Sequence, residues 1–148
     1  MSKPFALQTV LELMQRRADD ATRQLARLIA AEQDAKAKLD LLCQYREEYA
    51  RRFQLSAQDG MSPLQWKNFQ DFLARLDDAI AQQQQFVLQS RNKTTAGQAH
   101  WQEQRVRLKA IDTLSVRHYK AEDAKENRRE QKQVDEIASR RHLEDDTD

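Results

Sequence analysis

The stretch Ser56-Ala57-Gln58-Asp59-Gly60-Met61-Ser62-Pro63 decides the fold, because it is the clearest break between two long helical patterns. Gly60 can adopt the left-handed conformation that ends a helix, Ser62 can cap the next helix, and Pro63 suits its first position. From Pro4 to this stretch, no glycine or proline interrupts the chain. A connection this short returns the second helix antiparallel to the first.

Before this turn, apolar residues recur at alternating steps of four and three residues. Twelve of the fourteen positions are apolar, and the series extends over about seven heptads. A repeat of about 3.5 residues over this length is typical of a left-handed coiled coil. The series, called the seam below, is Leu7, Leu11, Met14, Ala18, Ala21, Leu25, Leu28, Glu32, Ala35, Leu39, Leu42, Arg46, Tyr49 and Phe53.

After the turn, a second seam begins with large residues from Trp66 to Val87 and resumes at Trp101. Between them lie small and polar residues, Ser90, Thr94 and Gly97. Because glycine inside a helix costs about 1 kcal/mol relative to alanine, we expect a thinner and softer segment there.

The sequence therefore predicts an all-α fold: two long helices in an antiparallel coiled-coil hairpin, forming a single domain over residues 1–148. We expect helix one over about 5–57, a turn over about 58–62, helix two over about 63–141, and a disordered acidic tail over 142–148. Helix two is the longer helix. Its charged end has three alternatives: a lone helix, a frayed tail, or a surface that becomes ordered on binding.

The composition excludes several classes of protein. Two glycines, two prolines and 33% charged residues argue against a globular fold with many turns and a thick core. The 25 basic and 24 acidic residues give a net charge of +1, so we expect no nucleic-acid partner.

A single cysteine, Cys43, fits a reducing cytoplasm. We find no signal peptide and no apolar run of about 18 residues, so we expect membrane association only through partners.

The sequence also lacks the motifs of catalytic sites. The two glycines form no phosphate-binding loop, and His100, His118 and His142 have no partners at metal-ligand spacing. A two-helix hairpin offers no enclosed pocket for a substrate. We therefore expect no enzyme activity, no catalytic residues, no metal and no cofactor.

Near the turn, the apolar stripe is wider than a two-helix seam can bury. Tyr45 and Phe72 stand beside the main seam of their helices. Two interpretations remain open. These rings form a plug that closes the turn end, or they form a partner site, since aromatic residues on a stable element are typical interface anchors. Alanine at either position separates the two, because a plug predicts lower stability and a partner site predicts lost binding.

Three elements, in this order around the turn, resemble the FliJ family, a coiled-coil component of the bacterial flagellar type III export apparatus. They are Tyr-x-x-x-Tyr at Tyr45 and Tyr49, Trp-x-x-Phe at Trp66 and Phe69, and Glu-Gln-Lys-x-x-Asp-Glu over residues 130–136. The resemblance extends over nearly the whole chain.

The resemblance implies a non-enzymatic export component that supports flagellum assembly and motility. Members of this family are similar in shape to the γ-subunit shaft of rotary ATP synthases. They promote assembly and activity of the hexameric export ATPase FliI, contact the cytoplasmic domain of the export gate FlhA, and are associated with flagellar export chaperones. The implied location is cytoplasmic, peripheral on the cell membrane at the flagellar base.

The resemblance also assigns two surfaces by residue. The gate-binding surface comprises Leu42, Tyr45, Tyr49, Phe72, Leu76 and Ala79, with Lys38 and Gln83 at its rim, where the family pattern has Gln and often His. The ATPase-ring contact comprises Arg128, Arg129, Gln131, Lys132, Asp135 and Glu136, for which a solvated charged helix is the alternative.

Two other functions stay open at this point. One is the equivalent stalk protein of a virulence type III secretion system, and the other is a generic coiled-coil adaptor or chaperone. Stimulation of the export ATPase distinguishes a shaft from an adaptor.

Overall fold

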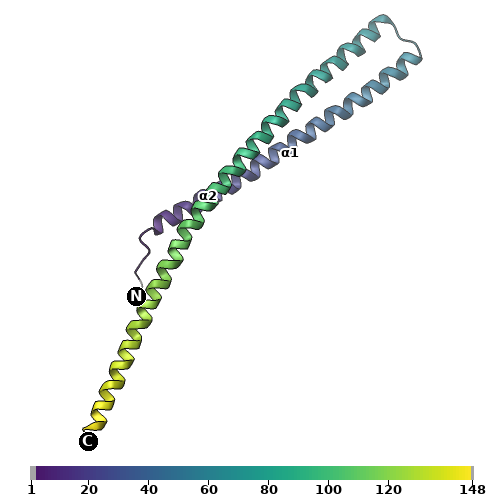
Figure 1. Ribbon diagram of the computed structural model, residues 1–148. Coiled ribbons are helices and arrows are strands. Elements are labelled where there is room, and N and C mark those ends of the chain that lie inside the picture. Colours follow the sequence, from purple (N-terminus) through teal and green to yellow (C-terminus); the bar gives the residue numbers. More distant parts are fainter. Residues whose placement is uncertain (1–2, 148) are drawn as a thin grey trace. The chain divides into compact units, whose positions relative to one another are not determined.

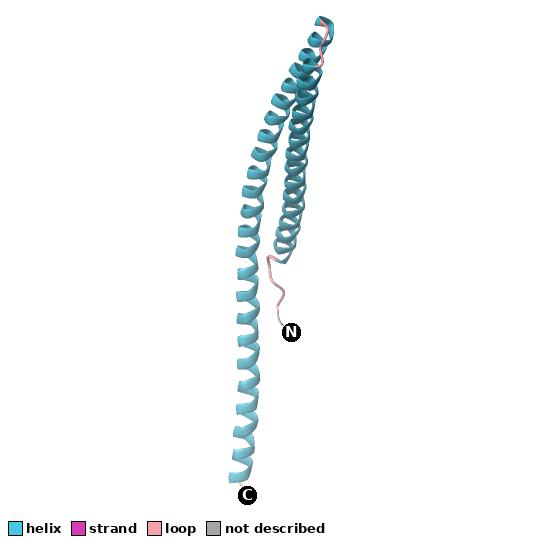
Figure 2. Ribbon diagram, turned by 90° about the vertical axis from the view of Figure 1, so that its right-hand side faces the viewer, coloured by secondary structure: helices cyan, strands magenta, loops and turns pink. Residues whose placement is uncertain are grey.

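The computed structural model describes residues 3–147 and contains two helices (Figure 1). Helix α1 spans Gln8–Gln58 and helix α2 spans Pro63–Asp146. No strand occurs in the described residues, and the main loops are residues 3–7 and the connection between the helices (Figure 2). The expected all-α hairpin of two helices packed against each other is confirmed.

The connection between the helices has the predicted turn chemistry. Gly60 adopts a φ of 98°, a left-handed conformation that favours glycine. The Gln65 backbone N–H donates to Ser62 Oγ at 3.2 Å, and the Ser62 backbone N–H donates to Gln65 Oε1 at 3.2 Å. This reciprocal pair is a capping box, and it satisfies N–H groups that the first turn of α2 leaves without helical partners.

Contacts within the chain form two compact units, and the expectation of a single domain over residues 1–148 stays a prediction. The first unit contains residues 20–102, including the turn. The second contains the chain up to Asp19 together with Glu103 and the residues after it.

Within the unit of residues 20–102, the predicted seams form the interface between α1 and α2. The positions that recur at steps of three and four are the buried and half-buried ones on both helices. The most buried are small: Ala35 is 1% exposed, and Ala21, Val87 and Ser90 are also buried. Small side chains at these positions allow the helices to approach closely, so this core is thin and narrow.

The segment around Gly97, for which we expected softness, is a place of close helix contact. A Cβ atom added at Gly97 would overlap Leu28 Cδ1 of α1. Thr94 Oγ1 lies 3.2 Å from the Leu28 backbone oxygen and 3.0 Å from that of Ser90, to which it can donate. Trp101 Nε1 donates to Thr22 Oγ1 at 3.0 Å. The proximity of α1 thus leaves no free space for a side chain at position 97 unless Leu28 shifts, and polar side chains connect the two helices.

Within the second unit, the first turn of α1 differs from the expectation. Leu7 is the first seam position by spacing, but it is 40% exposed, and Phe5 is buried instead. The helix begins at Gln8, where the Gln8 N–H donates to the Phe5 carbonyl at 3.0 Å. Residues 3–7 therefore do not follow helical periodicity, and the heptad count cannot identify which of them is buried.

The α2 seam of this unit runs through Gln104 and Ser115, both buried, to the half-buried Glu122. Every residue from 123 to 147 is exposed. Of the three alternatives for the charged end of α2, the structure shows the lone helix. The next seam positions by spacing are charged, so they offer no apolar stripe to a second helix: Lys125, Arg129, Lys132 and Glu136.

Helix α2 continues to Asp146, five residues past the end we expected at 141. No glycine or proline follows Gly97, so nothing interrupts the helix. His142 Nε2 lies 3.8 Å from Asp146 Oδ2, and Thr147 Oγ1 donates to the carbonyls of Leu143 and Glu144 at 3.1 and 2.9 Å. These contacts lie at the end of a helix, where we expected a disordered acidic tail. Asp148 lies outside the described residues.

Candidate interaction sites

A groove lies beside the interface of α1 and α2 near the turn, and we call it the outer groove. It has a volume of about 250 Å³ and contains four of the residues predicted to bind the gate. Its lining is aromatic and aliphatic in the middle and charged at the rim. The lining residues are Tyr45, Glu48, Tyr49, Arg52, Phe72 and Leu76.

The aromatic rings near the turn form a continuous stack between the helices. Tyr49 lies between two rings of α2, with centroid distances of 4.3 Å to Phe72 and 5.1 Å to Phe69. Phe53 in turn contacts Phe69 at 5.5 Å and Trp66 at 4.8 Å. Aromatic pairs at such distances stabilise a fold by about 0.5–1.5 kcal/mol beyond their burial. The plug and the partner site therefore share Tyr49 and Phe72.

Tyr45 and Phe72 nevertheless remain on the surface. Tyr45 is 51% exposed and Phe72 is 41% exposed, whereas Tyr49 and Leu76 are half-buried. By heptad spacing, Tyr45 and Phe72 each precede a seam residue by one position, so both flank the seam. The outer groove thus has a half-buried floor that belongs to the hairpin and two aromatic rings that are accessible to a partner.

The remaining residues assigned to the gate-binding surface are placed differently. Leu42 and Ala79 are half-buried, and Lys38 is exposed. Gln83 occupies a half-buried seam position, where its Nε2 donates to the Ala35 carbonyl at 3.0 Å. The amide of Gln83 therefore holds the two helices together. None of these four residues lines the outer groove.

One ion pair crosses between the helices next to this region. Arg46 Nε lies 2.5 Å from Asp77 Oδ1, and Arg46 Nη2 lies 3.4 Å from Asp77 Oδ2. The hydrogen bond from Arg46 lowers the pKa of the Asp77 carboxyl below its ordinary value, and the same bond raises the pKa of Arg46. Arg46 is one of the two polar positions in the first seam, and its charge is tolerated there because the side chain is 42% exposed beside Asp77.

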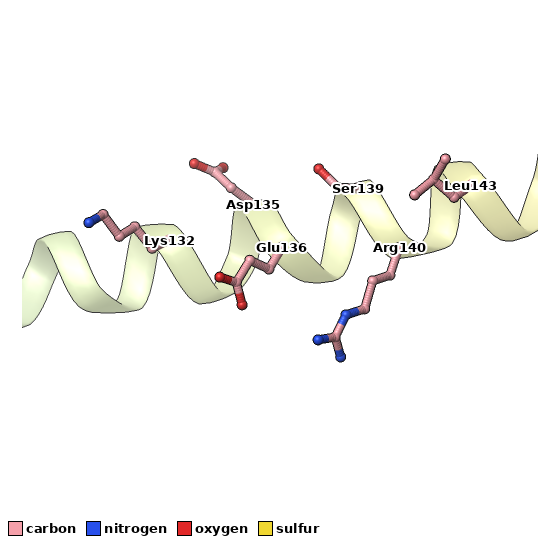
Figure 3. Close-up of a pocket in the computed structure, with 6 residues that line it drawn as sticks. All are labelled: Lys132, Asp135, Glu136, Ser139, Arg140 and Leu143. Atoms are coloured by element: carbon pink, nitrogen blue, oxygen red, sulfur yellow. The ribbon is translucent and has the colours of Figure 1, made fainter.

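The residues assigned to the ATPase ring all lie on the exposed part of α2. Arg128, Arg129 and Lys132 are exposed, and Gln131 Nε2 donates to Asp135 Oδ1 at 3.2 Å. In Figure 3, Asp135 and Ser139 project from one side of the helix, and Glu136 and Arg140 from the other. The shallow hollow drawn there follows a single helix, and its lining is Lys132, Asp135, Glu136, Ser139, Arg140 and Leu143. It is an open charged surface, which suits contact with another protein better than enclosure of a small molecule.

Within residues 3–147, no three His, Cys, Asp or Glu side chains gather so that they could hold a metal ion. Across the same residues, no helix contains a segment long and apolar enough to cross a membrane. Cys43 is a free, half-buried thiol.

Sequence reasoning missed two features of these surfaces. Glu48 and Arg52 form the charged rim of the outer groove, but on the sequence they resemble any exposed helical pair. Phe5 and His118 pack together, with ring centroids 5.5 Å apart, although 113 positions separate them. No spacing rule connects a loop residue with a residue so distant in the chain.

Comparison with known proteins then identifies the family. The family described as "FliJ: Flagellar FliJ protein" matches residues 2–146 of the chain. The chain belongs to the flagellar FliJ family. It is 33% identical over 140 residues to the Flagellar FliJ protein of Salmonella typhi and to that of Escherichia coli (strain K12), with 95% of each chain covered. It is 21% identical over 143 residues to the Flagellar FliJ protein of Bacillus subtilis (strain 168), with 97% of each covered.

Membership in the FliJ family supports a component of the flagellar export apparatus, with roles in flagellum biogenesis, protein export and motility. It also means that the resemblance inferred from three short elements holds over almost the full length of the chain. The family is not known as a family of enzymes.

Proposed function

We propose that this chain is a non-enzymatic connector of the flagellar export apparatus with two contact surfaces. The outer groove near the turn binds the cytoplasmic domain of the export gate FlhA. The exposed part of α2, residues 123–146, binds the export ATPase FliI and promotes assembly and activity of its hexameric ring. Flagellar export chaperones are further partners, and the chain reaches the membrane at the flagellar base only through these contacts.

The observation that supports the gate contact most directly is the exposure of two aromatic rings on a well-packed base. Aromatic side chains surrounded by polar groups contribute strongly to protein interfaces, because burying them removes a large apolar area from water. Tyr45 and Phe72 are such side chains, and their backbones are held by the interface of α1 and α2. Glu48 and Arg52 at the rim provide charges of both signs for orientation.

The observation that supports the ATPase contact is a long charged helix without a covering element. Its exposed side chains can contact several subunits of a ring at once, as a central element must. Such a connector changes the activity of the ATPase only if it binds one conformation of the ring more tightly than another. The proposed mechanism is therefore a difference in binding, and it requires no catalytic group on this chain.

A binding titration tests the gate contact. The full chain and its Tyr45→Ala and Leu41→Ala variants are titrated into the purified cytoplasmic domain of FlhA. Leu41 is the matched control, because it is exposed on the same helix but does not line the outer groove. We expect Tyr45→Ala to weaken binding by about tenfold or more, a typical loss for an interface anchor, and Leu41→Ala to leave it unchanged.

Equal binding by all three chains would contradict the gate contact and favour a generic adaptor. Circular dichroism of each variant provides the folding control, since both side chains are exposed and their loss is expected to preserve the helices.

A further inference from the structure

The charges that line the outer groove come from one helix only. Glu48 and Arg52 belong to α1, whereas α2 contributes the uncharged side chains of Phe72 and Leu76. The two charged residues are one helical turn apart, which is about 6 Å along the axis of α1. Arg52 is the nearer of the two to the end of α1 at Gln58. The groove lining therefore has a positive end toward the turn and a negative end away from it.

Both charges are available to a partner. Glu48 and Arg52 are exposed, and within residues 3–147 neither forms an ion pair. An acidic residue four positions before a basic one is a spacing at which helical ion pairs form. The pair closes elsewhere in this chain, where Arg107 Nη2 lies 2.6 Å from Glu103 Oε1. Because Glu48 and Arg52 do not pair with each other, each can pair with a charge on a docked segment.

The aromatic rings of the groove cannot supply this information. Contacts with Tyr45 and Phe72 are apolar, and the hydrophobic effect has no preferred direction. The rings alone would therefore accept a segment that runs either way along the hairpin. Two opposite charges along one helix axis distinguish the two directions, because the wrong one places like charges together.

We propose that Glu48 and Arg52 select the direction of the segment that binds in the outer groove. This segment packs an apolar side chain against Tyr45 and Phe72, and it carries a basic residue that faces Glu48 and an acidic residue that faces Arg52. The inference deepens the proposed gate contact and rests on it, so the segment belongs to the cytoplasmic domain of FlhA.

A charge swap tests the selection. The groove swap, Glu48→Arg with Arg52→Glu, reverses the order of the charges and keeps the net charge. The control swap is Glu47→Arg with Arg51→Glu, which has the same residue types at the same spacing. Both control residues are exposed on α1 and lie outside the groove lining. Each full-length chain is titrated into the purified cytoplasmic domain of FlhA.

We expect the groove swap to weaken binding by about tenfold or more, and the control swap to change it by less than about twofold. A neutral variant, Glu48→Gln with Arg52→Gln, loses the attraction without adding repulsion. It should therefore bind several-fold more weakly than the wild-type chain but more tightly than the groove swap. Circular dichroism compares the helicity of all four chains, and the control swap carries the same change in helical charge pattern as the groove swap.

Three results would overturn the inference. The first is equal binding by the groove swap and the control swap. The second is a groove swap that binds at least as tightly as the neutral variant, since reversal would then add no repulsion. The third is a neutral variant that binds as tightly as the wild-type chain. This last comparison applies even if the groove swap loses helicity.

The inference and the gate contact fail in distinguishable ways. If the wild-type chain does not bind the FlhA domain, the proposed gate contact is wrong and the inference fails with it. If Tyr45→Ala weakens binding but the groove swap does not, the gate contact stands and only the selection of direction is wrong.

Discussion

The ring of Tyr49 on α1 lies 4.3 Å from the ring of Phe72 on α2, yet Phe72 keeps 41% of its surface exposed. One side of Phe72 therefore stabilises the hairpin while the other side is available to a partner. This explains why spacing alone did not decide between a plug and a partner site. In this structure, one side of the Phe72 ring packs in the hairpin, and a partner site on its exposed side stays a prediction.

The first prediction separates these two contributions. Phe72→Ala removes a half-exposed ring from the stack, so we expect it to lower the free energy of unfolding by about 1–2 kcal/mol, less than the 3–5 kcal/mol typical of a fully buried phenylalanine. Tyr45 is more exposed and takes part in none of the ring stacks described above. We expect Tyr45→Ala to change stability by less than about 0.5 kcal/mol. Urea unfolding followed by circular dichroism measures both. Equal losses at both positions would show that Tyr45 belongs to the plug.

The second prediction concerns the close approach at Gly97. Alanine improves helix propensity by about 1 kcal/mol, but its methyl group collides with Leu28 of α1. The obstacle is the end of a half-buried side chain, so we expect Gly97→Ala to be destabilising by about 1 kcal/mol. In a Leu28→Ala background the collision is absent, and the same substitution should stabilise by about 1 kcal/mol. A double-mutant cycle in urea measures this reversal of sign. If Gly97→Ala changes stability equally in the wild-type and Leu28→Ala backgrounds, the contact between a methyl group at position 97 and Leu28 is ruled out.

The third prediction concerns Gln104, a buried seam residue of α2. It is 5% exposed, and its Oε1 has no hydrogen-bond partner among the described residues. An unsatisfied buried acceptor costs about 1–3 kcal/mol, so Gln104→Leu should raise the free energy of unfolding by about 1 kcal/mol or more. Gln102→Leu, at an exposed position two residues earlier, is the control and should have little effect. A lower melting temperature for Gln104→Leu would show that the amide is satisfied in solution.

The fourth prediction concerns pH. Arg46 lowers the pKa of Asp77 in the folded chain, so the carboxylate is favoured by folding. The ion pair therefore adds to the free energy of unfolding when the pH is above the ordinary carboxyl pKa, which is that of the unfolded chain. This stabilisation is lost as the pH falls from that value through the lower pKa of Asp77 in the folded chain. We expect Asp77→Asn to reduce stability at neutral pH and to have no effect in strong acid. Both side chains are exposed, so the difference is small. Urea unfolding across this pH range, with Asp78→Asn as control, measures it.

The fold was largely predictable from the sequence because a coiled coil follows a repeat that the residues themselves carry. The turn at Gly60, Ser62 and Pro63 and both seams needed only local rules, and the structure has them as expected. The exceptions are the first residue of each seam, Leu7 and Trp66, which are exposed. The close approach at Gly97 was not predicted, because propensity describes one helix and the proximity of α1 is a property of two.

The sites were less predictable, since each depends on a contact between distant residues. Spacing identified Tyr45 and Phe72 as lying outside the seam, but it could not show that Gln83 uses its amide to bond Ala35. The burial of Phe5 in place of Leu7 followed from a segment that leaves helical geometry, where periodicity carries no information.

The most direct test of the connector as a whole is the rate of ATP hydrolysis by purified FliI with increasing amounts of the full chain, measured together with the fraction of FliI in hexamers. We predict that both quantities rise and then saturate. Combined charge reversal at two exposed seam positions of the lone helix, Arg129→Glu and Lys132→Glu, should weaken the effect, and Lys109→Glu in the paired part of α2 should not. An unchanged hydrolysis rate and hexamer fraction at saturating wild-type chain would contradict the proposed function.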